Sequence, residues 1–201
     1  YKVAIVKYVD DASLNQIEDA IVAQLTAKEK ELGVKFEIKK YNGQADGTVL
    51  NQIAVDVVAE EVDAVIPIAT PAAVLLQAAT EDTDIPVIFS AVSNPVEDGL
   101  VADAQKPGAN VTGTSDGIDT EAIFKMMLLQ NPDMKKVGLL YDQGQSSSLV
   151  SIKDAEKFCK ANNIEVVKKT GTNVSEVQTA ADALVAAEVD AIFTPQDNTV
   201  M

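Results

Sequence analysis

The sequence contains no arginine, no histidine and no tryptophan, and it has one cysteine. All sixteen basic residues are lysines, set against thirty-one acidic residues, so the formal net charge is −15 at pH 7. Proteins that bind nucleic acids need a basic surface, and this charge balance excludes one. Without histidine there is no ordinary imidazole base, no Ser-His-Asp triad and no histidine-ligated metal. The single Cys159 excludes an internal disulfide and a cysteine cluster for a metal.

Long apolar runs are also missing. The most apolar stretch, residues 64–76, contains a threonine and two prolines and is shorter than the roughly 18–20 residues that span a bilayer. No signal peptide is visible before the first apolar strand, which is also how an exported protein looks after cleavage. No GxGxxG or GxxxxGK[ST] motif occurs, so the signatures of dinucleotide and phosphate sites are absent, and we expect no cofactor.

Short apolar runs alternate with longer helical patterns along the whole chain. Alternation of this kind predicts βαβ units, a parallel sheet and helices on both sheet faces, so the predicted fold class is α/β. In the first half, the predicted strands lie at 3–6, 34–38, 64–68 and 86–89.

The second half of the sequence repeats the first. Three matches keep their order at offsets of 134, 129 and 127 residues: KVAIV at 2–6 with KVGLL at 136–140, KK at 39–40 with KK at 168–169, and VDAVI at 62–66 with VDAIF at 189–193. A drifting offset with a conserved order predicts two copies of one unit whose loops differ in length.

The repeat predicts two doubly wound lobes. We expect lobe one at 1–115, a hinge crossover at 116–120 within a run of Thr, Gly, Ser and Asp, and lobe two at 121–201. The first copy continues for roughly 50 residues beyond the point where the second copy stops. The second lobe is therefore expected to be truncated, as in a fragment of a longer protein, with an exposed sheet edge.

Ligands of doubly wound sheets bind outside the carboxyl ends of the strands, where this sequence places hydroxyls, amides, carboxylates and no lysine. Thr70 and Pro71 are predicted as N-cap and first residue of a helix whose free amides suit a ligand carboxylate, although a well-capped helix without a ligand is the plainer alternative. The repeat matches Thr70 with Asp197. A carboxylate opposite an anion-receptive helix end fits a zwitterionic amino acid, while N-capping is the alternative role for Asp197.

Hydroxyl and aromatic side chains complete the expected site. No arginine is available for a bidentate clamp, so backbone amides and the hydroxyls of Ser146 and Ser147 would share the ligand carboxylate with the threonine. One serine of the run at 146–148 is expected simply to cap the next helix. Tyr8 and Tyr141 end the first strand of each copy and are the candidates to stack on a flat ligand. Cys159 lies on an apolar helix stripe and is expected to be a small buried residue.

Longer motifs resemble a known family. They are IATPAA at 68–73, IPVIFSAVSNPV at 85–96, KPGANVTG at 106–113 and VDAIFTPQDNTV at 189–200. Together they resemble the extracytoplasmic substrate-binding proteins of ABC transporters, in the branch whose known members bind tryptophan, phenylalanine or tyrosine. The resemblance implies a periplasmic-binding-protein type I fold, a cleft between two lobes, a membrane permease as partner, and a periplasmic or lipid-anchored location. It implies ligand contacts at Thr70, Ser90, Ala91, Asp116, Tyr141, Ser146, Ser147, Asp197 and Asn198, with Asn94 as a second candidate for the ligand ammonium.

The expected function is that of a non-enzymatic receptor, which closes over an aromatic amino acid and presents it to a permease. A receptor of the same fold for a sugar or nucleoside is one alternative. The effector domain of a transcription regulator is another, although the sequence lacks a basic DNA-binding segment. A cofactor-independent racemase of two-lobed type would need a cysteine in each lobe, and this sequence has only Cys159.

Overall fold

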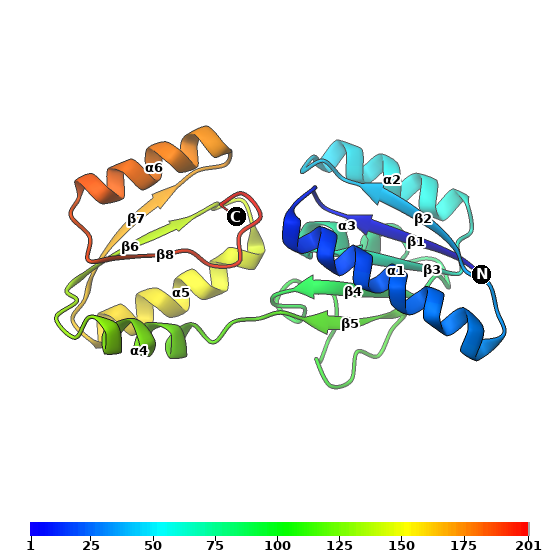
Figure 1. Cartoon of the computed structure of the whole chain (residues 1–201), viewed down its shortest axis with the longest axis horizontal. Helices are drawn as coiled ribbons and strands as arrows, with labels where there is room; N and C mark the ends of the chain where they lie inside the picture. Colours follow the sequence, from blue (N-terminus) through cyan, green and yellow to red (C-terminus); the bar gives the residue numbers. More distant parts are fainter. Residues whose placement is uncertain (201) are drawn as a thin grey trace. The chain divides into compact units, whose positions relative to one another are not determined.

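The structure, a computed structural model, describes residues 1–200. The chain divides into two compact units, unit 1 (Tyr1–Asp116) and unit 2 (Gly117–Met201). Each unit has its own parallel β-sheet with helices packed against it (Figure 1). The predicted α/β class with two parallel sheets is therefore confirmed.

Unit 1 alternates strands and helices along the chain. Its five strands are all parallel, in the order β2-β1-β3-β4-β5. Because β2 and β3 lie on opposite sides of β1, the chain changes direction there, and such switch points are where doubly wound sheets bind ligands. The elements are β1 (Lys2–Lys7), α1 (Ala12–Leu32), β2 (Glu37–Asn42), α2 (Gly47–Ala59), β3 (Ala64–Ile68), α3 (Thr70–Ala79), β4 (Val87–Val92) and β5 (Val111–Ser115).

Side chains of β1 alternate between the two faces of the first sheet. Ala4 and Val6 pack on the side of α2 and α3, whereas Val3 and Ile5 pack on the side of α1. All four are almost fully buried. Burial on both faces explains why this strand is a continuous apolar run, and it leaves the strand ends for function.

The second strand begins three residues later than the sequence predicts. Residues 34–36 belong instead to the connection after α1, where Glu29 accepts the backbone amides of Val34 and Phe36. The carbonyl of Glu29 accepts the amide of Val34 at 3.2 Å, and its side-chain Oε1 accepts the amide of Phe36 at 2.8 Å.

Unit 2 has three described strands, in the order β7-β6-β8. Val137 and Leu139 face α4 and α5, whereas Leu140 faces α6. Gly138 also lies against α6, where an added Cβ would be 2.9 Å from Leu184 Cδ2, so a larger residue would force Leu184 or the helix to shift. The elements are α4 (Thr120–Gln130), β6 (Lys136–Tyr141), α5 (Ser146–Ala161), β7 (Glu165–Thr170), α6 (Val174–Ala186) and β8 (Ala191–Phe193).

The same hydrogen-bonded arrangement of an aspartate and a lysine occurs in both units, which confirms the internal repeat. In unit 1, Asp63 Oδ2 accepts the amide of Lys2 at 2.7 Å. In unit 2, Asp190 Oδ2 accepts the amide of Lys136 at 2.8 Å. Each lysine Nζ also donates to the C-cap carbonyl of the helix just before the aspartate, at 3.4 Å for α2 and 3.2 Å for α6. We call this arrangement the Asp–Lys clasp.

The match between the two lysine pairs is wrong by one residue. Lys40 pairs with Ile5 across β1 and β2, and Lys168 pairs with Leu139 across β6 and β7. Because Ile5 and Leu139 correspond at the offset of 134, Lys168 corresponds to Lys40 and not to Lys39. Two identical adjacent residues could not fix this register from the sequence.

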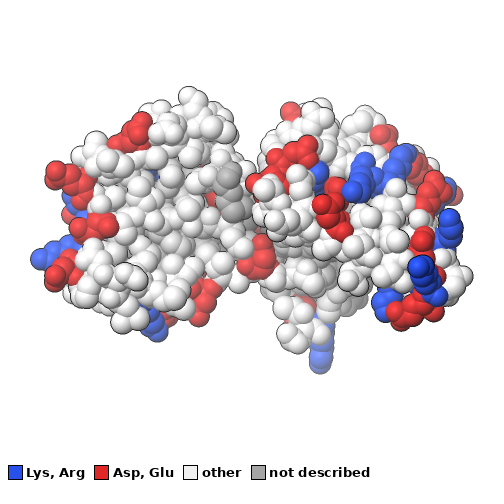
Figure 2. Space-filling view, in the orientation of Figure 1, with Lys and Arg blue, Asp and Glu red and all other residues white. Residues whose placement is uncertain are grey.

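Charged side chains of both signs share the visible face of unit 1 (Figure 2). Ion pairs within this unit include Lys39 with Glu60, and Lys28 with Glu31. The net charge of −15 is therefore not gathered into one acidic patch on that face. The visible face of unit 2 has a wide uncharged area over β8 and α5. Ile192 of β8 is among the exposed apolar residues of unit 2.

The boundary between the units lies between Asp116 and Gly117, within the segment 116–120 expected as a hinge. Movement at this segment, and the lobe bounds around it, stay predictions. Within the described residues, no helix combines the length and apolarity needed to cross a membrane.

Candidate functional site

The helix after β3 begins one residue earlier than predicted. Its first residue is Thr70 and its N-cap is Ala69, which has no side-chain hydrogen bond to the first turn. The prediction of Thr70 as N-cap is therefore wrong, and Thr70 and Pro71 are the first two helical residues. The amide of Ala69 donates to the carbonyl of Ser90 at 3.0 Å, which joins the ends of β3 and β4. Because no side chain caps the first turn of α3, its amides keep the capacity to receive an anion.

Four non-glycine residues at the carboxyl edge of the first sheet have left-handed backbone. Ala69 follows β3 with φ of 77°, and Ala91 lies in β4 with φ of 54°. Gln44 and Ala45, between β2 and α2, have φ of 54° and 55°. Among residues 1–200 the other three such residues follow helix ends, where this conformation is ordinary. A left-handed backbone costs a non-glycine residue roughly 1–3 kcal/mol, and residues in this conformation cluster at binding sites. The backbone therefore also indicates a binding site at this edge.

The expected residues of β4 and β5 lie at the same edge. Ser90, Ala91 and Asn94 are half-buried, the first two in β4 and the third in the turn after it. Asp116 follows β5, and its Oδ1 accepts the hydroxyl of Ser93 at 3.1 Å. Sequence reasoning did not single out Ser93, which holds Asp116 against the end of β4.

Tyr8 follows β1 directly, and its hydroxyl donates to the carbonyl of Ala45 at 3.4 Å. The residue before it is Lys7, so the expectation that no lysine lies at the strand ends is wrong. Lys7 is only 9% exposed. Burial lowers the pKa of Lys7, but hydrogen bonds and charges from Asp10 and Glu18 outweigh it and raise the pKa above the ordinary 10.5. Lys7 is therefore a charged group inside unit 1, and the missed signal was the acidic residue three positions later.

Asp197 is the centre of a polar network in unit 2 and is fully buried. Its Oδ1 accepts the amides of Thr199 at 2.9 Å and Val200 at 3.2 Å, which is the hydrogen-bond pattern of an N-cap, here on the turn at 198–200. Its Oδ2 accepts the amide of Asp142 and the hydroxyl of Ser148, both at 2.7 Å. A carboxylate accepts about four hydrogen bonds, so Asp197 has no acceptor position left for a ligand ammonium, the partner expected from the sequence.

Asp142, the first residue after β6, belongs to the same network and keeps spare acceptor capacity. Its Oδ1 accepts the amide of Gly144 and its Oδ2 accepts the hydroxyl of Thr199, both at 2.8 Å. Gln145 donates to Thr199 Oγ1 at 2.7 Å and accepts the Asn198 amide group at 2.9 Å. The structure thus brings the predicted Asn198 beside Gln145, which gave no sequence signal. Asp142 could have been found as the residue that ends a predicted strand.

The serine run begins α5. Its N-cap is Gln145, with no side-chain bond to the first turn, so the expectation that one serine caps this helix is wrong. Ser146 is exposed and Ser148 is bound to Asp197. Ser147 is 4% exposed, and its hydroxyl is buried without a hydrogen-bond partner among residues 1–200. A buried polar atom left in this state costs about 1–3 kcal/mol, which a ligand group at this helix end would relieve.

The two expected stacking residues lie in different environments. Tyr141 is 8% exposed and packs in the core of unit 2 with Phe124 and Ile152, so its ring is not open at the strand end. Tyr8 is half-buried and is the better placed of the two. Cys159 is fully buried, as predicted, and burial raises the pKa of its thiol to about 11.

The two edges hold groups that recognise ions and hydrogen-bond donors. Hydroxyls and free amides can donate to a carboxylate, and Asp142 can accept from an ammonium. Within the described residues, no three or more cysteine, aspartate or glutamate side chains are grouped to hold a metal ion. A groove of about 570 Å³ between α4 and α5 lies away from the strand ends and contains none of the predicted site residues.

This architecture is also found among solved structures. A periplasmic binding protein type 1 from Bordetella pertussis Tohama I superposes with a TM-score of 0.65 at 16% identity, covering 96% of this chain and 55% of that one. Identity this low shows the fold alone. The predicted periplasmic-binding-protein type I fold is confirmed.

The family model of ABC transporter substrate-binding proteins matches residues 2–201. A curated relative, the tyrosine-binding protein of Clostridioides difficile strain R20291, is 33% identical over 199 residues, which are 99% of this chain and 57% of the relative. The ABC domain from Streptococcus pneumonia in complex with L-Trp has a TM-score of 0.88 at 30% identity, covering 99% of this chain and 66% of that one. The chain belongs to the ABC transporter substrate-binding protein family, as the sequence motifs predicted. It spans less than two thirds of the length of these two relatives.

Proposed function

We propose that this chain is the ligand-binding part of an ABC importer receptor and that it binds an aromatic amino acid at the carboxyl edges of its parallel strands. Family membership supports the receptor role, and the printed tyrosine and L-Trp ligands of two relatives support the ligand class. The observation that carries the proposal is the buried hydroxyl of Ser147, which has no hydrogen-bond partner among residues 1–200.

Each unit offers one group that suits the ligand carboxylate: the first turn of α3 in unit 1, and the hydroxyl of Ser147 in unit 2. The first-turn amides of α3 have no capping side chain, and Thr70 brings a hydroxyl to the same helix end. Amides and hydroxyls are the proposed donors to the ligand carboxylate because the sequence has no arginine.

The ligand ammonium is assigned to Asp142 rather than to Asp197. Both acids belong to one network, but Asp197 already accepts four hydrogen bonds and Asp142 accepts two from its partners in unit 2. A hydrogen bond to a charged acceptor contributes about 1.5–3 kcal/mol, enough to select amino acids over their neutral analogues. The ring of the ligand is assigned to Tyr8.

The receptor is proposed to be non-enzymatic, extracytoplasmic and a partner of a membrane permease, with hinge movement at 116–120 closing the lobes over the ligand. A lipid anchor is a further part of this proposal.

Isothermal titration calorimetry tests the ligand class. L-tyrosine, L-tryptophan and L-phenylalanine should bind, while tyramine and tryptamine, which lack the carboxylate, should not. Asp142→Asn should weaken amino-acid binding about tenfold or more, as expected for the loss of a charged hydrogen bond. Binding of ribose, a nucleoside or myo-inositol with no response to amino acids would replace the proposed ligand class.

A further inference from the structure

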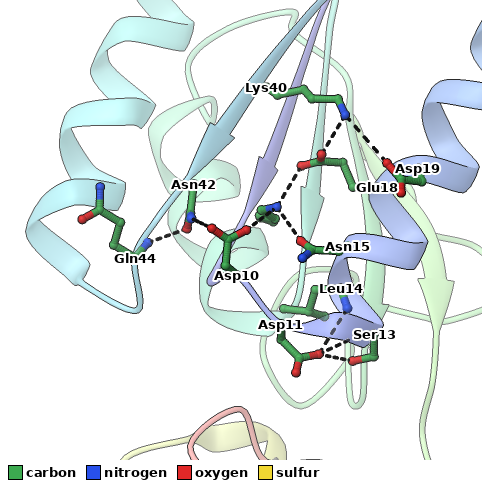
Figure 3. Close-up of polar contacts among 11 residues, drawn as sticks. Asp10, Asp11, Ser13, Leu14, Asn15, Glu18, Asp19, Lys40, Asn42 and Gln44 are labelled. Carbon is green, nitrogen blue, oxygen red and sulfur yellow. Dashed lines mark hydrogen bonds and ion pairs between the residues drawn. The ribbon is translucent and has the colours of Figure 1, made fainter.

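We propose that Lys7 is a positioning residue. It connects the loop after β1 to the loop after β2 in unit 1 and thereby fixes the position of the Tyr8 side chain. Three side chains carry the connection, and we call them the Lys7 relay: Lys7, Asp10 and Asn42. Figure 3 shows Asn42 linked on one side to Asp10 and on the other to Gln44.

Asp10 and Asn42 each use a separate polar atom for each neighbour in the relay. Lys7 Nζ lies 2.6 Å from Asp10 Oδ1. The other oxygen of Asp10 accepts the Asn42 amide group at 2.9 Å. Asn42 Oδ1 then accepts the backbone amide of Gln44 at 2.8 Å (Figure 3). The orientation of Asn42, and with it the hydrogen bond to Gln44, therefore depends on Asp10 and on the lysine that holds Asp10.

The relay ends on a strained turn that contacts Tyr8. Gln44 and Ala45 both have left-handed backbone, a conformation that persists only where the surroundings impose it. The amide of Ala45 donates to the carbonyl of Tyr8 at 2.9 Å, and the Tyr8 hydroxyl donates to the carbonyl of Ala45 at 3.4 Å. The turn therefore contacts both the backbone and the ring end of Tyr8.

Lys7 is not required to neutralise the buried acid on α1. Glu18 lies 2.8 Å from Lys40 through Oε1, whereas its Oε2 is 3.5 Å from Lys7 (Figure 3 labels the two residues Glu18 and Lys40). The closest contacts of Lys7 are instead Asp10 and Asn15, at 2.6 and 2.5 Å. Lys40 shares the acid with Lys7 but touches no member of the relay by side chain, so Lys40→Met is the matched control.

The consequence for the ligand rests on the proposed function, in which Tyr8 stacks on the aromatic ring. A turn released from its strained conformation no longer fixes the Tyr8 hydroxyl, and the ring must then be ordered when the ligand binds. Ordering on binding weakens affinity without removing any direct contact.

The test compares Lys7→Met, Asp10→Ala, their double variant and Lys40→Met in the full chain. The first readout needs no ligand: amide hydrogen exchange of Gln44 and Ala45, followed by NMR. We expect exchange about tenfold faster in Lys7→Met and Asp10→Ala, no further increase in the double variant, and the parent rate in Lys40→Met. The second readout is the affinity for L-tyrosine, which should fall about tenfold in the first three variants only.

Urea denaturation of each variant separates a local effect from a general loss of stability. Unchanged exchange at Gln44 in Lys7→Met, or an equal increase in Lys40→Met, would overturn the relay. Faster exchange with unchanged affinity would overturn the role of the relay in setting Tyr8. If the parent binds no amino acid, the proposed function fails, and the exchange rates still decide whether the relay exists.

Discussion

The backbone amide of Asp142 donates to Oδ2 of Asp197 at 2.7 Å, so the residue after β6 is held by a carboxylate 55 positions later. This contact fixes the start of the β6–α5 loop to the segment after β8. It also makes Asp197 a structural acceptor, which changes what a substitution there should do.

Asp197→Asn is expected to destabilise the protein by about 1–3 kcal/mol, because the new NH₂ group faces donors where the carboxylate accepted them. The measurement is the urea midpoint, with an unchanged slope indicating a simple loss of stability. Asp154→Asn, at an exposed position of α5, is the control and should stay within about 0.5 kcal/mol of the parent. A parent-like midpoint for Asp197→Asn would mean that the network does not hold the two loops.

The Asp–Lys clasp of unit 2 predicts a pH dependence of stability. Backbone hydrogen bonds from Lys135 and Lys136 lower the pKa of Asp190 below its ordinary 3.8. A lowered folded-state pKa gives stability that is present above 3.8 and is lost as the pH falls through the folded-state value. Denaturation of the parent and of Asp190→Asn between about pH 3 and pH 7 should show the variant with the smaller loss on acidification. Parallel pH curves would contradict the clasp.

Cys159 should be unreactive in the folded protein. Burial, with a smaller effect of the Glu156 charge, raises the pKa of the thiol from 9.0 to about 11. Because the unfolded state loses this proton first, the thiol should lower stability as the pH rises from 9 towards 11. Labelling by a thiol reagent near pH 8 should be at least about a hundredfold faster in urea than in buffer. Rapid labelling of the native protein would place the thiol at the surface.

Gly138→Ala is expected to destabilise unit 2 by about 1–3 kcal/mol, since its new Cβ would lie 2.9 Å from the fully buried Leu184. Gly47→Ala is the matched control, because an added Cβ there meets nothing within 4 Å and the position starts α2. The control should be neutral or stabilising by about 0.4–1 kcal/mol. Equal midpoints for the two variants would show that α6 can move aside.

The fold could be predicted from the sequence because burial imposes the pattern. A strand buried on both faces, such as β1, must be a continuous apolar run. The Asp–Lys clasp gives similar short sequences around Asp63 and Asp190, so the repeat can be recognised. The register of the lysine pair could not be predicted, because neither lysine is fixed by packing.

The site was less predictable, for two physical reasons. The start of α3 depends on the left-handed backbone of Ala69, which no alanine signals in a sequence. From the sequence, Lys7 is expected to be a solvated residue at the end of a strand, because its partners are not known. The roles of Asp142 and Gln145 depend on hydrogen bonds to residues more than fifty positions away. The types of residue in the sequence were enough to locate the carboxyl edge of each sheet. Which of those residues remain available to a ligand depends on their hydrogen-bond partners, which only the structure shows.

The Asp–Lys clasp also bears on the order in which the chain acquires its structure during synthesis. In unit 1 the clasp and every strand pairing join residues within the first 116 positions. A ribosome delivers about 5–20 residues each second, so the first sheet can be complete before the strands of the second have emerged. Because the strand pairings and the clasp of unit 1 need no residue of unit 2, the nascent chain can fold in steps.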